Sequence, residues 1–189
     1  MRLTMPVVVL GGLLAASPAA AHSFRLGLVA PFSGPEASAG QQALDGLRLA
    51  TRERDGHPDE TSDGHLGGLD SYLVPLDSAA GDAAALRRQA DELRLDIVTT
   101  AGPVPGLGAA LGGASAEFCP PGPGPVPAGR LADPEAAAFV AAFRRAFGRD
   151  PTPAAARGCN AGRAVDAAVR ALGDKSGKAA LARLCPAGN

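Results

Sequence analysis

Residues 24–54 read FRLGLVAPFSGPEASAGQQALDGLRLATRER, and this stretch predicts a strand, a loop and a helix in succession. Residues 24–30 form a short apolar run that ends at the loop 31–35, which is typical of a buried strand. From residue 37 onward the apolar residues recur at helical spacing on one face, at Ala43, Leu44, Leu47 and Ala50. The sequence therefore predicts an opening strand–helix unit.

The same alternation of strand and helix continues to residue 119. Residues 71–76 (SYLVPL) predict a second strand, in which Pro75 favours an edge position or a strand end. A third strand is predicted at 95–100 (LDIVTT) and a fourth, very short one at 115–119. Helices between parallel strands cross over on both faces of the sheet. We expect an α/β fold, a three-layer Rossmann-like lobe with a mainly parallel sheet of three or four strands.

Helices are predicted between and after these strands. Asp82 can cap a helix before the third strand, and a small-residue helix is expected to run to about Ala114. Residues 120–130 (PPGPGPVPAGR) cannot form a helix or a central strand and predict a connector. Beyond it, Asp133 and Pro134 start a helix that Gly148 ends; two more are expected after Pro153 and at 178–184. The domain boundaries expected from these patterns are 22–119 for the strand–helix part, 120–132 for the connector and 133–189 for the C-terminal helices packing on the same lobe.

The first 21 residues have the order of a secretory signal peptide. Arg2 is followed by an apolar run at 5–16, and Ala19-Ala20-Ala21 offers a cleavage site. The apolar run is too short for a spanning helix. We therefore expect export to the periplasm, a mature chain that starts at His22, and no membrane insertion after cleavage.

Three cysteines, Cys119, Cys159 and Cys185, would enter an oxidising compartment and allow at most one internal disulfide. Cys159 and Cys185 are the expected pair, because both lie in the C-terminal helical region.

Composition and motifs exclude several functions. The chain has 189 residues, a formal charge of −1, no Trp and one Tyr, so it lacks both the basic field and the aromatic platforms that bind nucleic acid. The glycines at 106, 108 and 112 do not have dinucleotide-loop spacing, and no cofactor is expected. With three histidines and no GxSxG elbow around Ser33, an enzyme is not expected either.

Four stretches occur in a recognisable order: 26–50 (LGLVAPFSGPEASAGQQALDGLRLA), 66–78 (LGGLDSYLVPLDS), 96–103 (DIVTTAGP) and 139–172. In this order they resemble the type I periplasmic binding proteins, the leucine-binding-like receptors of ABC importers. The resemblance implies a substrate-binding component for branched-chain amino acids or related small solutes. Its ligand would lie at the carboxyl ends of the strands, and the residues expected to line this cleft are Ser33, Gly34, Ser38, Thr100, Ala101 and Gly102.

The chain departs from this family in one large respect. Family members close their ligand between two lobes, but the matching motifs here pass from the fourth strand through the connector directly to the late helices. We therefore expect a protein reduced to its N-terminal lobe, with a truncated cleft and weak or altered ligand binding. An ABC permease or a second copy of the chain is the expected partner beside the solute.

A polar segment at 55–65 carries a second hypothesis. Its imidazoles and carboxylates, His57, Asp59, Asp63 and His65, are ligand types that suit zinc, copper or nickel. The competing interpretation is a solvated, hairpin-like insertion without a metal. A metal site here would favour the alternative function, a repurposed periplasmic binding or interaction module.

Overall fold

The computed structural model describes residues 23–53, 61–121, 124–173 and 184–185. These residues form one five-stranded sheet with the order β2-β3-β1-β4-β5. The strands are β1 (Ser23–Ala30), β2 (Gly64–Leu66), β3 (Leu69–Asp77), β4 (Ile97–Thr100) and β5 (Glu117–Cys119). All neighbours pair in parallel except β2 and β3, which are antiparallel. The predicted α/β class and mainly parallel sheet are confirmed.

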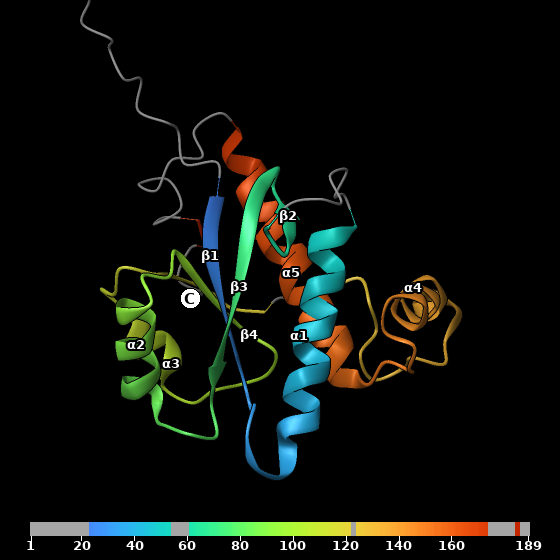
Figure 1. Ribbon diagram of the computed structural model, residues 1–189, viewed down its shortest axis with the longest axis horizontal. Coiled ribbons are helices and arrows are strands. Elements are labelled where there is room, and N and C mark those ends of the chain that lie inside the picture. The colour runs from blue at the N-terminus through green and yellow to red at the C-terminus, as the bar shows by residue number, and fades with distance from the viewer. Residues whose placement is uncertain (1–22, 54–60, 122–123, 174–183, 186–189) are drawn as a thin grey trace, which may run out of the picture.

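Helices cover both faces of the sheet, so the lobe has three layers (Figure 1). The helices are α1 (Ala37–Arg52), α2 (Ala83–Glu92), α3 (Leu107–Leu111), α4 (Ala137–Phe147) and α5 (Pro153–Leu172), with short 3-10 turns η1 (Gly34–Glu36) and η2 (Pro134–Ala136). One core joins Leu26 and Leu28 of β1 to α1 and α5. A second core joins Val29 and Leu76 to α2 and α3 on the opposite face. Helix α4 packs outside α1 and α5, as Figure 1 shows.

The sheet has one strand more than the three or four that were predicted. The additional strand, β2, lies inside a segment that looked like polar loop, and Gly67 and Gly68 turn it back into β3. Both glycines have positive φ, at 65° and 86°, which fits the two-residue turns that match the twist of a hairpin. This hairpin was not predicted, although the Gly-Gly pair between Leu66 and Leu69 is a sequence signal for such a turn.

Beyond Ser71 the outer edge of β3 has no partner strand in β2, and the side chain of Asp63, which precedes β2, bonds to it. Asp63 Oδ2 accepts a hydrogen bond of 2.9 Å from the backbone N–H of Leu73, and Pro75 has no N–H to offer. Pro75 lies beyond the three residues that pair with β2, which agrees with the predicted edge position. Charged side chains and prolines on an edge discourage pairing with another chain.

Helices α1 and α5 approach each other backbone to backbone through glycines. A Cβ built on Gly46 would lie 1.9 Å from the carbonyl oxygen of Ala155, and one on Gly158 would lie 1.9 Å from that of Ala43. Real Cβ contacts essentially never fall below 3.0 Å. Only glycine fits at these two positions, so the pair of helices forms one closely packed layer.

Polar contacts tie the connector to α5. Asn160 in α5 accepts from the N–H of Val126 at 3.1 Å and donates to its carbonyl at 2.9 Å, which pins the connector to the helix. Asp133 stands at the N-cap position of η2, where its side chain makes no cap hydrogen bond and pairs with Arg130 at 3.2 Å. Helix α3 ends at Leu111 rather than near Ala114, because Gly112 leaves helical geometry and Gly113 has a positive φ of 77°.

The disulfide prediction was wrong. Cys119 at the end of β5 pairs with Cys185, with 5.2 Å between their Cα atoms. Cys159 is instead buried where α5 meets α1 and α4, so it faces away from the sheet edge at which the bond forms. Both partners are far apart in sequence, and spacing alone could not reveal their contact.

The predicted signal peptide and most of the predicted last helix at 178–184 lie outside the described residues. Within the described part, no helix is both long enough and apolar enough to cross a membrane.

Candidate functional site

A pocket of about 180 Å³ lies at the carboxyl ends of β1, β3 and β4. In open α/β sheets this edge is where ligands bind. The lining comes from the loop after β1, from the ends of β3 and β4, and from the start of α5: Val29, Ala30, Pro31, Glu36, Ala39, Ala43, Ser78, Ala101, Gly102, Pro103, Val104, Ala154 and Arg157. This volume is below the range of about 300–1,000 Å³ that is usual for ligand pockets, so it suits only a small solute.

Asp77 holds the loop that forms one wall of this pocket. Its Oδ1 accepts hydrogen bonds from the N–H groups of Phe32, at 2.8 Å, and Ala79, at 3.0 Å. A hydrogen bond from the Ser33 hydroxyl is the largest effect that lowers the pKa of the Asp77 carboxyl. Backbone N–H groups of Ala79, Phe32 and Ser33 lower this pKa further, and desolvation opposes them. The ionised carboxylate therefore ties the ends of β1 and β3 together.

Replacement of Asp77 by alanine is expected to lower the melting temperature most at neutral pH. Because the folded-state pKa lies below the ordinary value of 3.8, the carboxylate stabilises the fold above that value and stops doing so as pH falls through the folded pKa. The difference in melting temperature between wild type and variant should therefore shrink below about pH 4. Thermal denaturation from pH 7 to pH 2.5 measures this, and a difference that stays constant over the range would contradict the role of the charge. Ser33→Ala should raise the Asp77 pKa in an NMR titration.

Arg157 brings a positive charge to the opposite wall of the pocket. Its Nε donates to the carbonyl oxygen of Ala101 at 2.7 Å, across 56 residues of sequence. This bond fixes the guanidinium at the end of β4 while the side chain remains exposed. The N-terminus of α5, which carries the partial positive charge of a helix dipole, lies at the same place. Glu36, also exposed, supplies the negative charge among the lining residues.

The residues predicted from the sequence are only partly brought together. Ala101 and Gly102 line the pocket, whereas Ser33 interacts with Asp77 and Ser38 is exposed outside the lining. Gly34 begins η1 with a φ of 70°, and Thr100 is buried with 2% of its surface exposed. Sequence reasoning missed Arg157, Glu36 and Ser78. A charged residue in the first turns of a helix is common, and only the fold reveals that Arg157 reaches β4.

The proposed metal ligands are not assembled within the described residues. Asp63 bonds to Leu73 and, through Oδ1, to Arg48 Nε at 3.4 Å, while His65 Nε2 lies 2.9 Å from Asp70 Oδ1. Among the residues that the structure describes, no group of three or more metal-binding side chains occurs. His57 and Asp59 lie outside those residues, so the metal site stays a prediction.

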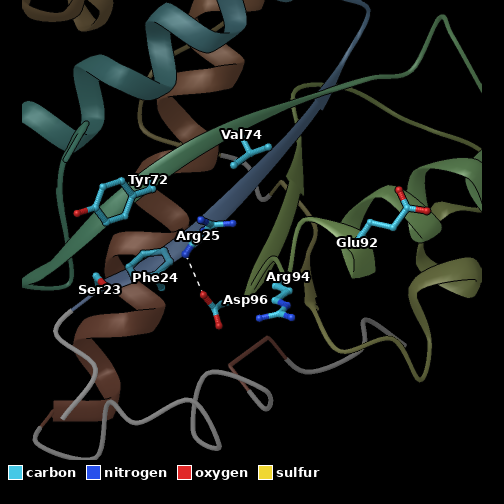
Figure 2. A pocket seen from close by; sticks show the side chains of 8 residues that line it. All are labelled: Ser23, Phe24, Arg25, Tyr72, Val74, Glu92, Arg94 and Asp96. Atoms are coloured by element: carbon cyan, nitrogen blue, oxygen red, sulfur yellow. Dashed lines mark hydrogen bonds between the residues drawn. The ribbon is translucent and has the colours of Figure 1, made fainter. Parts of the chain in front are cut away.

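A larger hollow, of about 910 Å³, lies at the other end of the strands (Figure 2). Its lining joins the amino ends of β1 and β3 to the turn between α2 and β4: Ser23, Phe24, Arg25, Tyr72, Val74, Glu92, Arg94 and Asp96. Asp96 Oδ2 accepts a hydrogen bond of 2.9 Å from the backbone N–H of Arg25, drawn as a dashed line in Figure 2. This hollow is distinct from the pocket that the resemblance predicts.

Comparison with known proteins gives structural neighbours only. No family model and no curated protein matches the chain. A solved structure of an ABC transporter solute-binding protein from R. palustris in complex with benzoate is similar, with a TM-score of 0.48 and 15% identity over 86% of this chain and 85% of that one. A second, from Rhodopseudomonas palustris BisB5 in complex with 3,4-dihydroxy benzoic acid, has a TM-score of 0.47 and 12% identity over 85% and 84% of the two chains.

Both neighbours are solute-binding proteins of ABC transporters. The described residues have the architecture of a single Rossmann-like lobe, with one mostly parallel sheet between two helix layers.

Proposed function

We propose that this chain is an exported, periplasmic solute-binding protein with a truncated cleft, acting with an ABC importer and without catalytic chemistry. The observation that carries the proposal is the pocket at the carboxyl ends of the strands, with one cation and one anion in its lining. Arg157 would pair with a carboxylate of the solute and Glu36 with its ammonium group. These contacts, with the backbone of Ala101 and Gly102, favour an amino-acid-type solute, and the sequence resemblance narrows it to branched-chain or related small ones.

Affinity should be modest, because a single lobe leaves part of the solute in water. Small-ligand sites of high affinity bury most of the ligand, and each loss of about 1.4 kcal/mol of interaction weakens binding tenfold. We expect leucine to bind more weakly than about 1 μM, at about 8 kcal/mol of binding free energy or less. An ABC permease, or a second copy of the chain, would supply the missing wall.

Calorimetric titration of the mature chain, residues 22–189, tests this proposal with leucine and with 4-methylpentanoate, which lacks the amine. Arg157→Gln is expected to weaken both ligands about tenfold, by loss of a charge-assisted hydrogen bond. Glu36→Gln should weaken leucine alone. Arg145→Gln, which removes an exposed arginine on α4, serves as the matched control and should change neither affinity.

Two outcomes would contradict the proposal in different ways. If neither ligand binds at millimolar concentration, or if Arg157→Gln has no effect, the pocket is not the solute site. If the monomer binds leucine with submicromolar affinity, the cleft is complete and the proposal of a truncated cleft is wrong.

A further inference from the structure

We propose that the hollow at the amino ends of β1, β3 and β4 is a second binding site, for a small molecule that carries a carboxylate or phosphate beside a flat ring. The site lies at the opposite end of the strands from the carboxyl-end pocket and does not depend on the proposed function. Two arginines and a tyrosine from separate elements line this hollow (Figure 2).

Within the described part of the chain, the floor of the hollow is a part of the sheet with accessible side chains. β1 is a central strand, paired with β3 on one side and β4 on the other, and such strands are normally buried on both faces. Here Arg25 is exposed and lies in register with Tyr72 of β3, which is half-buried. A charged side chain next to an aromatic ring at this place gives the sheet face a polar, ligand-accepting surface.

The wall is formed by a turn whose backbone conformation does not suit its residue. Arg94 has a φ of 52° and is the one non-glycine residue with positive φ in the described part of the chain. It follows α2 in a Schellman motif, in which Arg94 N–H bonds to Asp91 O at 3.1 Å and Leu95 N–H to Ala90 O at 2.9 Å. Glycine is the usual residue at this position, because other residues are strained there. An arginine that is kept at the cost of strain points to a role for its side chain in the hollow.

Both arginines line the hollow, Arg25 from β1 and Arg94 from the turn after α2. Arg25 Nη1 donates to the carbonyl oxygen of Leu93 at 2.9 Å, which holds it next to the turn that carries Arg94. Within the described chain neither guanidinium forms an ion pair, whereas Asp96 uses a carboxylate oxygen on the backbone of Arg25. Glu92 is the exposed acid on the rim.

This arrangement matches an oxyanion with an attached ring. Arginine presents several N–H donors in a plane and binds carboxylate or phosphate through two parallel bonds, and its planar group also stacks on aromatic rings. Tyr72 offers its ring to the flat part of the same ligand. The rim carboxylate of Glu92 opposes an anion, so its neutralisation should strengthen binding.

The test is a titration of the full chain with phenyl phosphate, inorganic phosphate and phenylacetate, which separate the contributions of ring, phosphate and carboxylate. Phenyl phosphate should bind more tightly than inorganic phosphate, and Tyr72→Leu should remove that difference. Arg94→Gly should weaken phenyl phosphate at least tenfold while it raises the melting temperature, because glycine relieves the strained φ. Glu92→Gln should strengthen the binding of phenyl phosphate, and saturating leucine should not displace phenyl phosphate.

Arg88→Ala is the matched control, because it removes an exposed arginine from α2 that does not line the hollow. An equal loss of affinity in Arg88→Ala and Arg94→Gly would mean non-specific attraction and overturn the site. Absence of binding by all three probes, or unchanged affinity in Arg94→Gly, would overturn it as well. A fall in melting temperature of Arg94→Gly without a change in affinity would assign Arg94 a purely structural role.

Discussion

The Cys119→Ser, Cys185→Ser double variant is expected to lose about 4 kcal/mol of unfolding free energy relative to the oxidised protein. The bond spans a sequence separation of 66 residues, and closing a loop of that length removes much of the conformational entropy of the unfolded chain. Native domains are stable by about 5–15 kcal/mol, so the variant would stand close to the limit of folding. Replacing both cysteines avoids leaving a reactive thiol behind.

Urea unfolding without reductant measures this loss, and wild type in dithiothreitol should unfold at the same urea concentration as the variant. Cys159→Ala is the control, because it leaves the bond intact and acts only through packing. If the double variant were as stable as oxidised wild type, the bond would not restrict the unfolded chain.

The second large effect is expected from Gly158→Ala in α5. In an exposed helix this change adds about 1 kcal/mol of stability, because alanine is the better helix former. Here the new Cβ would lie 1.9 Å from the carbonyl oxygen of Ala43, so α1 and α5 must separate. Overpacking of this kind costs about 3 kcal/mol, so Gly158→Ala should destabilise the protein instead of stabilising it. Gly46→Ala should behave alike, from the other helix.

Chemical denaturation of Gly158→Ala beside Gly129→Ala tests the close approach, since nothing lies within 4 Å of a Cβ on Gly129. We expect a change within about 0.5 kcal/mol for Gly129→Ala, as for other substitutions on open surface. A Gly158→Ala protein as stable as wild type would show that the helices do not touch through their backbones.

Local pattern predicted most of the fold because burial imposes a period on each element. The apolar run of β1 and the spaced leucines of α1 needed no knowledge of their partners, and Asp82 does cap α2 by accepting from the N–H of Ala85 at 2.8 Å. The predictions that failed concerned contacts between residues far apart in the sequence. The pairing of Cys119 with Cys185, like the bond from Arg157 to Ala101, depends on how distant segments meet.

The candidate pocket lies at the edge of the sheet named from the sequence, but its charged lining residues were not predicted. Topology places ligands at the carboxyl ends of parallel strands, so the backbone of Ala101 and Gly102 could be named in advance. The charged residues could not, because their side chains enter from helices whose position is set by packing. Arg94 could not be singled out either, because among the described arginines it is its positive φ that distinguishes it.

The burial of Cys159 has a consequence for how the chain acquires its cross-link. Burial raises the pKa of this thiol to about 12, against a smaller lowering by Arg163, so at pH 7 only about one molecule in 10⁵ carries the reactive thiolate. Once α5 has docked on α1 and α4, Cys159 is withdrawn from thiol–disulfide exchange, and oxidation can join only the remaining two sulfurs. In a chain where α5 docks before oxidation, burial of Cys159 therefore leaves the Cys119–Cys185 bond as the accessible one of three pairings.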